Sequence, residues 1–195
     1  MNQTQLKELL LQSLVHEKGG VLVYKTALEA VLNDDLRQEW QKYLGQTEKH
    51  VGILANTCQA LGIDPGEMTP GCQIVQNQGK ALVISIKAAL AANNPIAAEL
   101  VACECVLLAE TKDHADWELL SKCAEALDGE AGAALKSACE AVEPEEDKHL
   151  YHTQGWAREL WLKSLGLEAQ LPPPEEEQDV TSAAEAQHAR ESADS

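Results

Sequence analysis

The sequence contains no phenylalanine, and aromatic residues make up only 4% of its 195 residues. It also lacks the alternating runs of β-branched residues that are typical of strands, whereas alanine, leucine, glutamate and glutamine are abundant. These features argue against a sheet-based fold and predict an all-α protein. A chain of this length is long enough to bury a real core in one domain.

Basic residues are scarce, since 15 Lys and Arg face 32 Asp and Glu and give a formal net charge of −17. Nothing basic is available to neutralise phosphates, so the composition argues against a nucleic-acid partner and makes cations the natural partners. The N-terminus has no signal-peptide pattern, and the longest apolar run, 81–92, is too short for a membrane span and contains Lys87. We therefore expect a cytoplasmic protein with no membrane partner.

The six cysteines form no CxxC pair. Most of them fall where a helical pattern is running, which predicts reduced thiols that serve mainly as small core residues. A zinc site built from cysteines is not expected.

Helical periodicity and capping signals divide the chain into four long helices and one short one. The long helices are expected over 4–32, from the Asn33–Asp35 cap to Leu61, over 95–127 and over 130–165, with a bend or restart at Pro144. Gly, Pro and polar residues over 62–79 indicate a long connection, and 81–92 indicates a short apolar helix. We interpret 62–92 as a crossover on the outside of an antiparallel four-helix bundle, which lets the second and third long helices run parallel.

The end of the chain differs in composition. Beyond Gly166 it contains Pro172–Pro174 and a Ser/Ala/Glu-rich stretch, with seven acidic residues and one Arg between 172 and 195. This composition predicts a bundle domain over 1–166 and a disordered acidic tail over 167–195.

The pair Glu146 and His149 is the most informative feature of the sequence. Residues at i and i+3 share one face of a helix, so one metal ion can meet both side chains. The stripe that contains them is otherwise mostly apolar, with Val142 before the pair and Trp156 after it, which predicts that the pair points inward. A buried carboxylate usually pairs, becomes neutral or binds a metal.

The other three long helices also carry Glu or His near their midpoints. Glu17, His50, and Glu110 with His114 would therefore meet Glu146 and His149 in one layer of the bundle. Each residue alone has a plain alternative, since Glu17 could sit at the edge of its stripe and His50 could be a hydrogen-bonded core residue. Their common depth favours a metal site, with a structural network of buried Glu and His as the alternative. The six predicted ligands are Glu17, His50, Glu110, His114, Glu146 and His149, and no other catalytic residue is predicted.

At these residues the chain resembles the ferritin-like superfamily, whose dinuclear sites take a Glu from two helices and Glu-x-x-His from the other two. The segment 43–51, with Leu54, Leu61-Gly62, Pro65 and Cys72, is similar to the second helix and following loop of the YciE/YciF-type stress-induced ferritin-like proteins of bacteria. The resemblance covers about residues 5–165. The chain departs from it in two ways: Gln46 stands where a ligating Glu is expected, and only the last helix keeps an intact Glu-x-x-His.

The resemblance implies a bacterial stress-response protein that binds two iron ions, with manganese as the alternative metal. Glu146 or Glu17 would bridge the ions, His50, His114 and His149 would be terminal ligands, and Glu110 would complete the set. Ferroxidase or peroxide-consuming activity would follow, and a homodimer or higher homo-oligomer is expected. The departure at Gln46 and the acidic tail leave a second hypothesis open, a metal-free degenerate bundle that acts as an interaction or structural protein through dimerisation and its tail.

Overall fold

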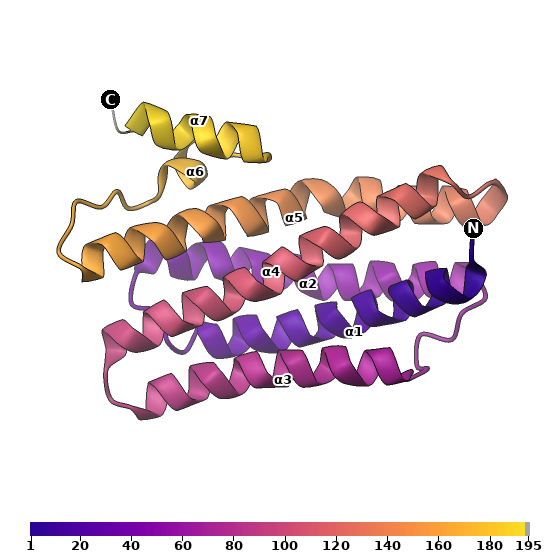
Figure 1. The fold of residues 1–195 in the computed structure, drawn as a ribbon, viewed down its shortest axis with the longest axis horizontal. Helices are drawn as coiled ribbons and strands as arrows, with labels where there is room; N and C mark the ends of the chain where they lie inside the picture. The colour runs from indigo at the N-terminus through magenta and orange to yellow at the C-terminus, as the bar shows by residue number, and fades with distance from the viewer. Residues whose placement is uncertain (194–195) are drawn as a thin grey trace.

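The computed structural model describes residues 1–193, and within this range the chain is all-helical, as the composition predicted. The seven helices of this range are α1 (Gln3–Ala27), α2 (Asp34–Ala60), α3 (Pro70–Ala91), α4 (Pro95–Glu125), α5 (Gly129–Ser164), α6 (Pro174–Glu177) and α7 (Ala183–Ala193). Figure 1 shows α1 to α5 as long rods lying roughly along one direction, with α6 and α7 beside α5.

Side chains just before the helices fix where they begin. The Asn33 side chain accepts hydrogen bonds from the backbone N–H groups of Asp35 and Leu36, so α2 starts at the predicted cap. Asn2 caps α1 in the same way, and Asn94 caps α4 ahead of a first-turn proline. These interactions are local in sequence, which explains why the cap at Asn33 could be predicted.

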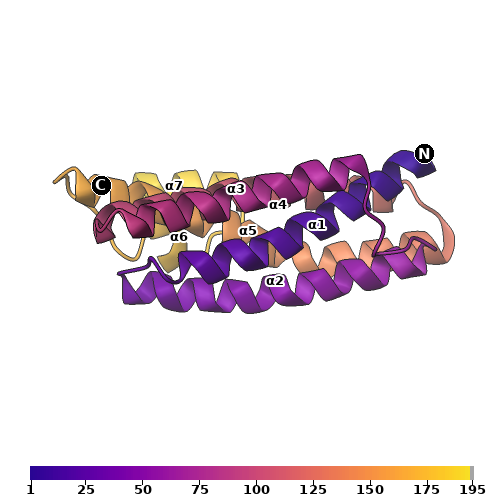
Figure 2. The ribbon, with the colours of Figure 1, turned by 90° about the horizontal axis from the view of Figure 1, so that it is seen from below.

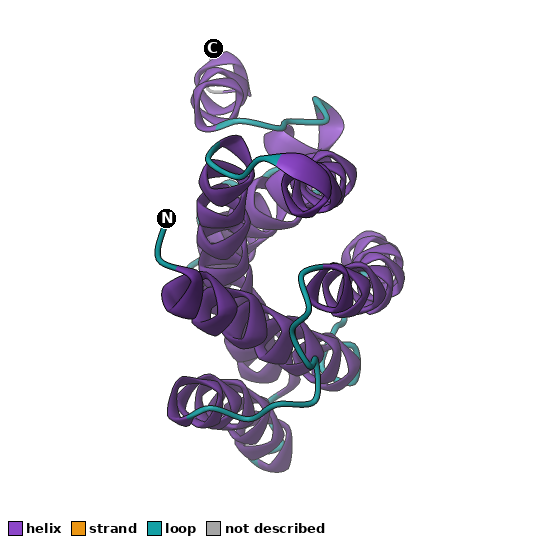
Figure 3. Cartoon of the chain, turned by 90° about the vertical axis from the view of Figure 1, so that its right-hand side faces the viewer, coloured by secondary structure: helices purple, strands orange, loops and turns teal. Residues whose placement is uncertain are grey.

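The four longest helices pack in a ring. α1 contacts α2 and α4, and α5 contacts α4 and α2, while α3 packs against α1 and α4 from outside the ring. Figure 3 views the long helices nearly end-on. α1 packs along α2 (Figure 2), and α2 and α4 run in the same direction because α3 returns the chain between them (Figure 1). The α5 helix continues through Pro144 without ending there.

The connection after α2 is more ordered than the sequence predicted. Instead of a short helix over 81–92, α3 spans Pro70–Ala91. Its glycines lower helix propensity, but they also allow close packing: a Cβ atom on Gly79 would lie 3.5 Å from the Cα atom of Gly19 in α1. Burial against α1 and α4 therefore outweighs the weak intrinsic preference of this segment.

α1 ends at Ala27 rather than near Leu32 because side chains of α2 and α4 hold the turn that follows it. The Glu99 carboxylate of α4 accepts hydrogen bonds from the backbone N–H groups of Leu32 and Asn33, at 2.7 and 2.8 Å. The Arg37 guanidinium donates to the carbonyl groups of Leu28 and Val31. These partners belong to tertiary structure, so helical periodicity alone could not reveal them.

The sequence predicted a disordered tail over 167–195, but the part of it that the structure describes contains two helices. α6 packs against α5, and α7 packs against α6. Glu175 is fully buried and accepts two hydrogen bonds from the Arg158 guanidinium, at 2.6 and 2.9 Å. Val180 and two alanines of α7 form a small apolar cluster with Tyr151. One buried charged pair and one apolar contact thus order a segment whose composition is typical of disorder. Residues 194 and 195 lie outside the described range.

The core is split in two by a polar layer. One apolar cluster surrounds Trp40 and Trp156, and the other surrounds Trp117, Leu10 and Leu135. The residues between these clusters along each helix include buried Glu, Asp and His side chains. All six cysteines are free, and all except Cys123 are buried. Among the described residues, no helix combines the length and apolar character needed to cross a membrane.

Candidate metal centre

Five of the six predicted ligands meet in the polar layer. Glu17 comes from α1, His50 from α2 and Glu110 from α4, while Glu146 and His149 come from successive turns of α5. Each side chain belongs to the inward stripe of its helix, and none of the five residues is more than 3% exposed. Four helices therefore place carboxylates and imidazoles at the same depth, as the sequence predicted.

Glu146 is the centre of this cluster. Its Oε1 atom lies 2.9 Å from Nδ1 of His50 and 3.1 Å from Nδ1 of His149. Glu17 Oε1 lies 3.6 Å from Nδ1 of His50, and Glu110 Oε2 lies 3.5 Å from Nδ1 of His149. The cluster thus contains two groups that share Glu146, and in each group one donor atom per residue lies within 4.8 Å of the others: Glu17, His50 and Glu146; Glu110, Glu146 and His149.

The donor atoms of the cluster approach one another without forming hydrogen bonds. Both carboxylate oxygens of Glu146 and the Nδ1 atoms of His50 and His149 have no hydrogen-bond partner, although their separations are within hydrogen-bond range. One oxygen each of Glu17 and Glu110 is also unpaired. Buried polar atoms without partners are costly, and convergence on common points is the arrangement that ligands adopt around a cation. The residues present therefore fit a metal ion.

Outer partners fix the orientation of both imidazoles. His50 Nε2 lies 2.8 Å from Glu145 Oε2, and His149 Nε2 lies 3.0 Å from Gln46 Oε1. Because each Nε2 faces an acceptor, it carries the proton and leaves Nδ1 unprotonated toward the cluster when the ring is neutral. Gln46 therefore supports His149 from the side of the imidazole that faces away from the cluster. Trp117 similarly donates to Glu17 Oε1 at 2.9 Å.

Without a cation, the buried cluster is neutralised by bound protons. Burial and the neighbouring Glu146 raise the pKa of Glu17 well above its usual range and also raise the pKa of Glu110. Burial alone would raise the pKa of Glu146, but His149 and His50 hold it below its usual range. Burial alone would lower the pKa of His149, but Glu146 and Glu110 raise it to about 10. The cluster thus holds bound protons where a divalent cation could supply the positive charge instead.

Comparisons of the chain with protein-family models, with curated proteins and with solved structures find no significant match. The case for the site accordingly rests on its own geometry.

His114, the sixth predicted ligand, does not lie in either group of the cluster. Its Nε2 atom lies 2.9 Å from Asp147 Oδ1, and its side chain is 15% exposed. After Glu110, the inward stripe of α4 continues through Asp113 and Trp117 rather than through His114. The periodicity of Trp117, Leu120 and Ala124 carried this signal, because these apolar residues lie in phase with Asp113.

Asp113 is the residue that sequence reasoning missed. It is buried, and its Oδ1 atom has no hydrogen-bond partner. Burial and the charges of Glu17, Glu146 and Glu110 raise its pKa well above its usual range. Asp113 therefore borders the cluster as a fourth carboxylate.

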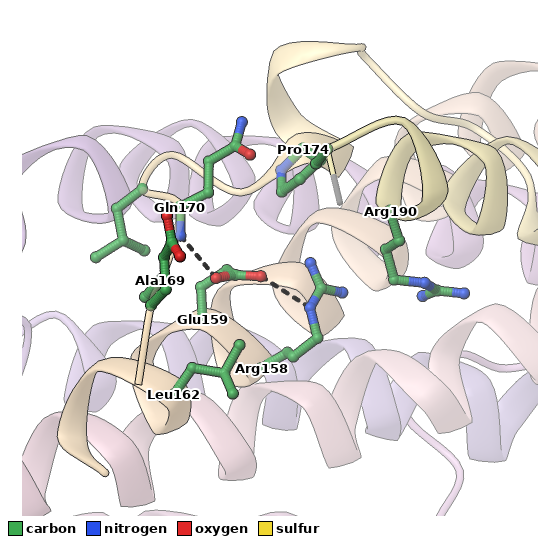
Figure 4. Close-up of a pocket in the computed structure, with 10 residues that line it drawn as sticks. Arg158, Glu159, Leu162, Ala169, Gln170, Pro174 and Arg190 are labelled. Atoms are coloured by element: carbon green, nitrogen blue, oxygen red, sulfur yellow. Dashed lines mark hydrogen bonds and ion pairs between the residues drawn. The ribbon is translucent and has the colours of Figure 1, made fainter. Parts of the chain in front are cut away.

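A larger cavity, of about 820 Å³, lies away from the cluster between α5 and the C-terminal segment. Figure 4 shows Arg158 and Glu159 on its wall, with Glu159 bonded both to Arg158 and to the backbone N–H of Gln170. The Arg158 guanidinium is also bound to Glu175, so its charge is already paired. None of the described residues that line this cavity carries a buried polar atom without a hydrogen-bond partner, which is the feature that distinguishes the cluster.

Proposed function

We propose that this chain is a ferritin-like metal-binding protein that binds two iron ions in its core and oxidises ferrous iron with dioxygen or peroxide. The observation that carries the proposal is the set of buried, unpaired donor atoms on Glu17, His50, Glu110, Glu146 and His149. One ion would be held by Glu17, His50 and Glu146, and the other by Glu110, His149 and Glu146.

The donor set favours iron or manganese over softer metals. Each group offers two carboxylates and one imidazole, with no thiolate, and hard oxygen donors with imidazole suit Fe²⁺ and Mn²⁺. Bound ferrous iron would supply electrons to the oxidant. The chain would contribute orientation through Gln46 and Glu145, and the apolar clusters on both sides would limit access of water. A role in oxidative stress would follow from this activity.

The proposal is tested by the iron content of the full chain. Metal-free protein without a His-tag is incubated anaerobically with ferrous iron and desalted, and iron per chain is measured by elemental analysis. We expect about two irons per chain, as the two groups of ligands suggest, and oxygen consumption when the loaded protein meets air. No iron on a chain that keeps its helical circular dichroism would refute the proposal.

The alternative function, a metal-free interaction protein that acts through dimerisation and its acidic tail, was favoured by the missing carboxylate at Gln46 and by the tail. Gln46 instead supports His149, and the described part of the tail is docked on α5. Failure of the chain to take up metal would favour this alternative.

Gln46 provides a second test. Gln46→Ala removes the acceptor that orients His149, and loss of such an outer partner typically costs roughly 10- to 100-fold in metal affinity. We expect weaker binding of one ion, measured by competition with a chromophoric chelator. The matched control is Gln59→Ala, an exposed position on the same helix, which should leave both affinities unchanged. Equal affinities in the two variants would remove Gln46 from the site.

A further inference from the structure

A cavity of about 270 Å³ lies between α4 and α5 and adjoins the metal cluster. We call it the α4/α5 pocket, and its lining residues are His114, Trp117, Glu118, Glu143, Glu146 and Asp147. Their exposure decreases along the pocket: Glu118 is exposed and Asp147 is half-buried, whereas Trp117 and Glu146 are each 1% exposed. The pocket therefore leads from solvent to the cluster.

The lining of the α4/α5 pocket is strongly acidic. Four of its six residues are Glu or Asp, and neither Lys nor Arg is among them. A cleft whose walls carry one sign of charge focuses the field and raises the local concentration of counter-ions. His114 of α4 and Asp147 of α5 lie 2.9 Å apart, so the two walls together present an imidazole and a carboxylate.

The buried end of the pocket is Glu146, and neither of its carboxylate oxygens has a hydrogen-bond partner. The same residue belongs to both groups of the cluster. An ion that reached the end of the pocket would therefore meet the one side chain common to both metal positions.

We propose that the α4/α5 pocket is the entry port for divalent cations, in which His114 and Asp147 are the first donors an incoming ion meets and Glu146 receives it. This inference rests on the proposed metal-binding function. It also assigns a role to His114, which lines the pocket but belongs to neither group of the cluster.

The port is tested by the rate of iron uptake. Full-length, metal-free protein is mixed anaerobically with ferrous iron, the quenching of tryptophan fluorescence is followed by stopped flow, and final iron content is measured after desalting. The test variant is Glu143→Gln/Asp147→Asn. Its control, Glu130→Gln/Glu140→Gln, removes the same charge from exposed positions of α5. We expect uptake to be about tenfold slower in the test variant and within about twofold of the unaltered protein in the control, since steering by a charged cleft changes rates by about 10 to 1,000-fold.

The final iron content distinguishes the outcomes. A port residue changes the rate and leaves the content unchanged, so a lower content in the test variant would make these residues ligands and overturn the inference. Equal uptake rates would overturn the port and leave the metal site intact. If the unaltered protein takes up no iron, the proposed function and the port fail together.

An exposed substitution on the opposite wall gives an independent check without risk to folding. Glu118→Lys places a positive charge at the mouth of the pocket, and it should slow uptake more than Glu125→Lys, the same change on the exposed face of α4. Equal rates in these two variants would also overturn the port.

Discussion

Replacing Glu146 with glutamine should abolish binding of both metal ions, from about two irons per chain to none. Glu146 is the only residue shared by the two groups of ligands in the described part of the chain, and its Oε1 atom lies near both imidazoles. Glutamine keeps the shape of the side chain but removes the charge and replaces one donor oxygen with an N–H₂ group, which cannot bind a cation. The measurement is iron per chain after anaerobic loading and desalting.

Variants of a residue that belongs to only one group of ligands are the comparison for Glu146→Gln. Glu17→Gln and Glu110→Gln should each lose about one iron, because each residue belongs to only one group. Glu140→Gln, an exposed change on α5, should keep both. Circular dichroism of the metal-free proteins checks that each variant is folded. Retention of two irons by Glu146→Gln would mean that the cluster is a structural network and that iron binds elsewhere on the chain.

The sequence predicted the depth of the polar layer because that depth depends on helix lengths and turns, which local signals control. The caps at Asn33 and Asn94 set the starts of α2 and α4, and the Glu146 and His149 pair follows from i, i+3 spacing within one helix. In α4 the predicted ligand was His114, although the spacing of Trp117, Leu120 and Ala124 is in phase with Asp113. His114 and Asp113 differ by one residue, about 100° around the helix, and the choice between them is made by packing of Trp117 against the core.

The features that could not be predicted all depend on contacts between segments distant in sequence. The role of Gln46 becomes visible only when His149, more than a hundred residues away, lies beside it. The order of the C-terminal segment depends in the same way on Arg158, because Glu175 has no local partner that would favour a buried position. The composition of a segment describes that segment alone, whereas each of these interactions joins two residues from different segments.

Replacing Glu175 with alanine should release the C-terminal segment from α5. The Glu175 carboxylate is fully buried and binds the Arg158 guanidinium through two hydrogen bonds, and Arg190 of α7 lies 3.5 Å from it. Removal of one partner of a buried ion pair leaves the other charge unpaired and typically costs about 3–5 kcal/mol. Arg158 is partly exposed and can regain water, so we expect a loss in free energy of unfolding near the lower end, about 3 kcal/mol, and rapid proteolysis within 167–193. Glu177→Ala, an exposed change in the same short helix, is the control and should cost no more than about 0.5 kcal/mol.

Gly155→Ala tests the same docking without altering any charge. A Cβ atom on Gly155 would lie 2.7 Å from Glu175 Oε2 and 2.9 Å from the Cβ atom of Pro173, so the C-terminal segment would have to move. Alanine is also the better helix former, by about 1 kcal/mol, so α5 itself should gain stability. The two effects separate the segment from the helical ring: proteolysis within 167–193 should increase while iron content stays near two per chain. If iron content fell together with docking, the C-terminal segment would have to support the metal cluster as well as cover α5.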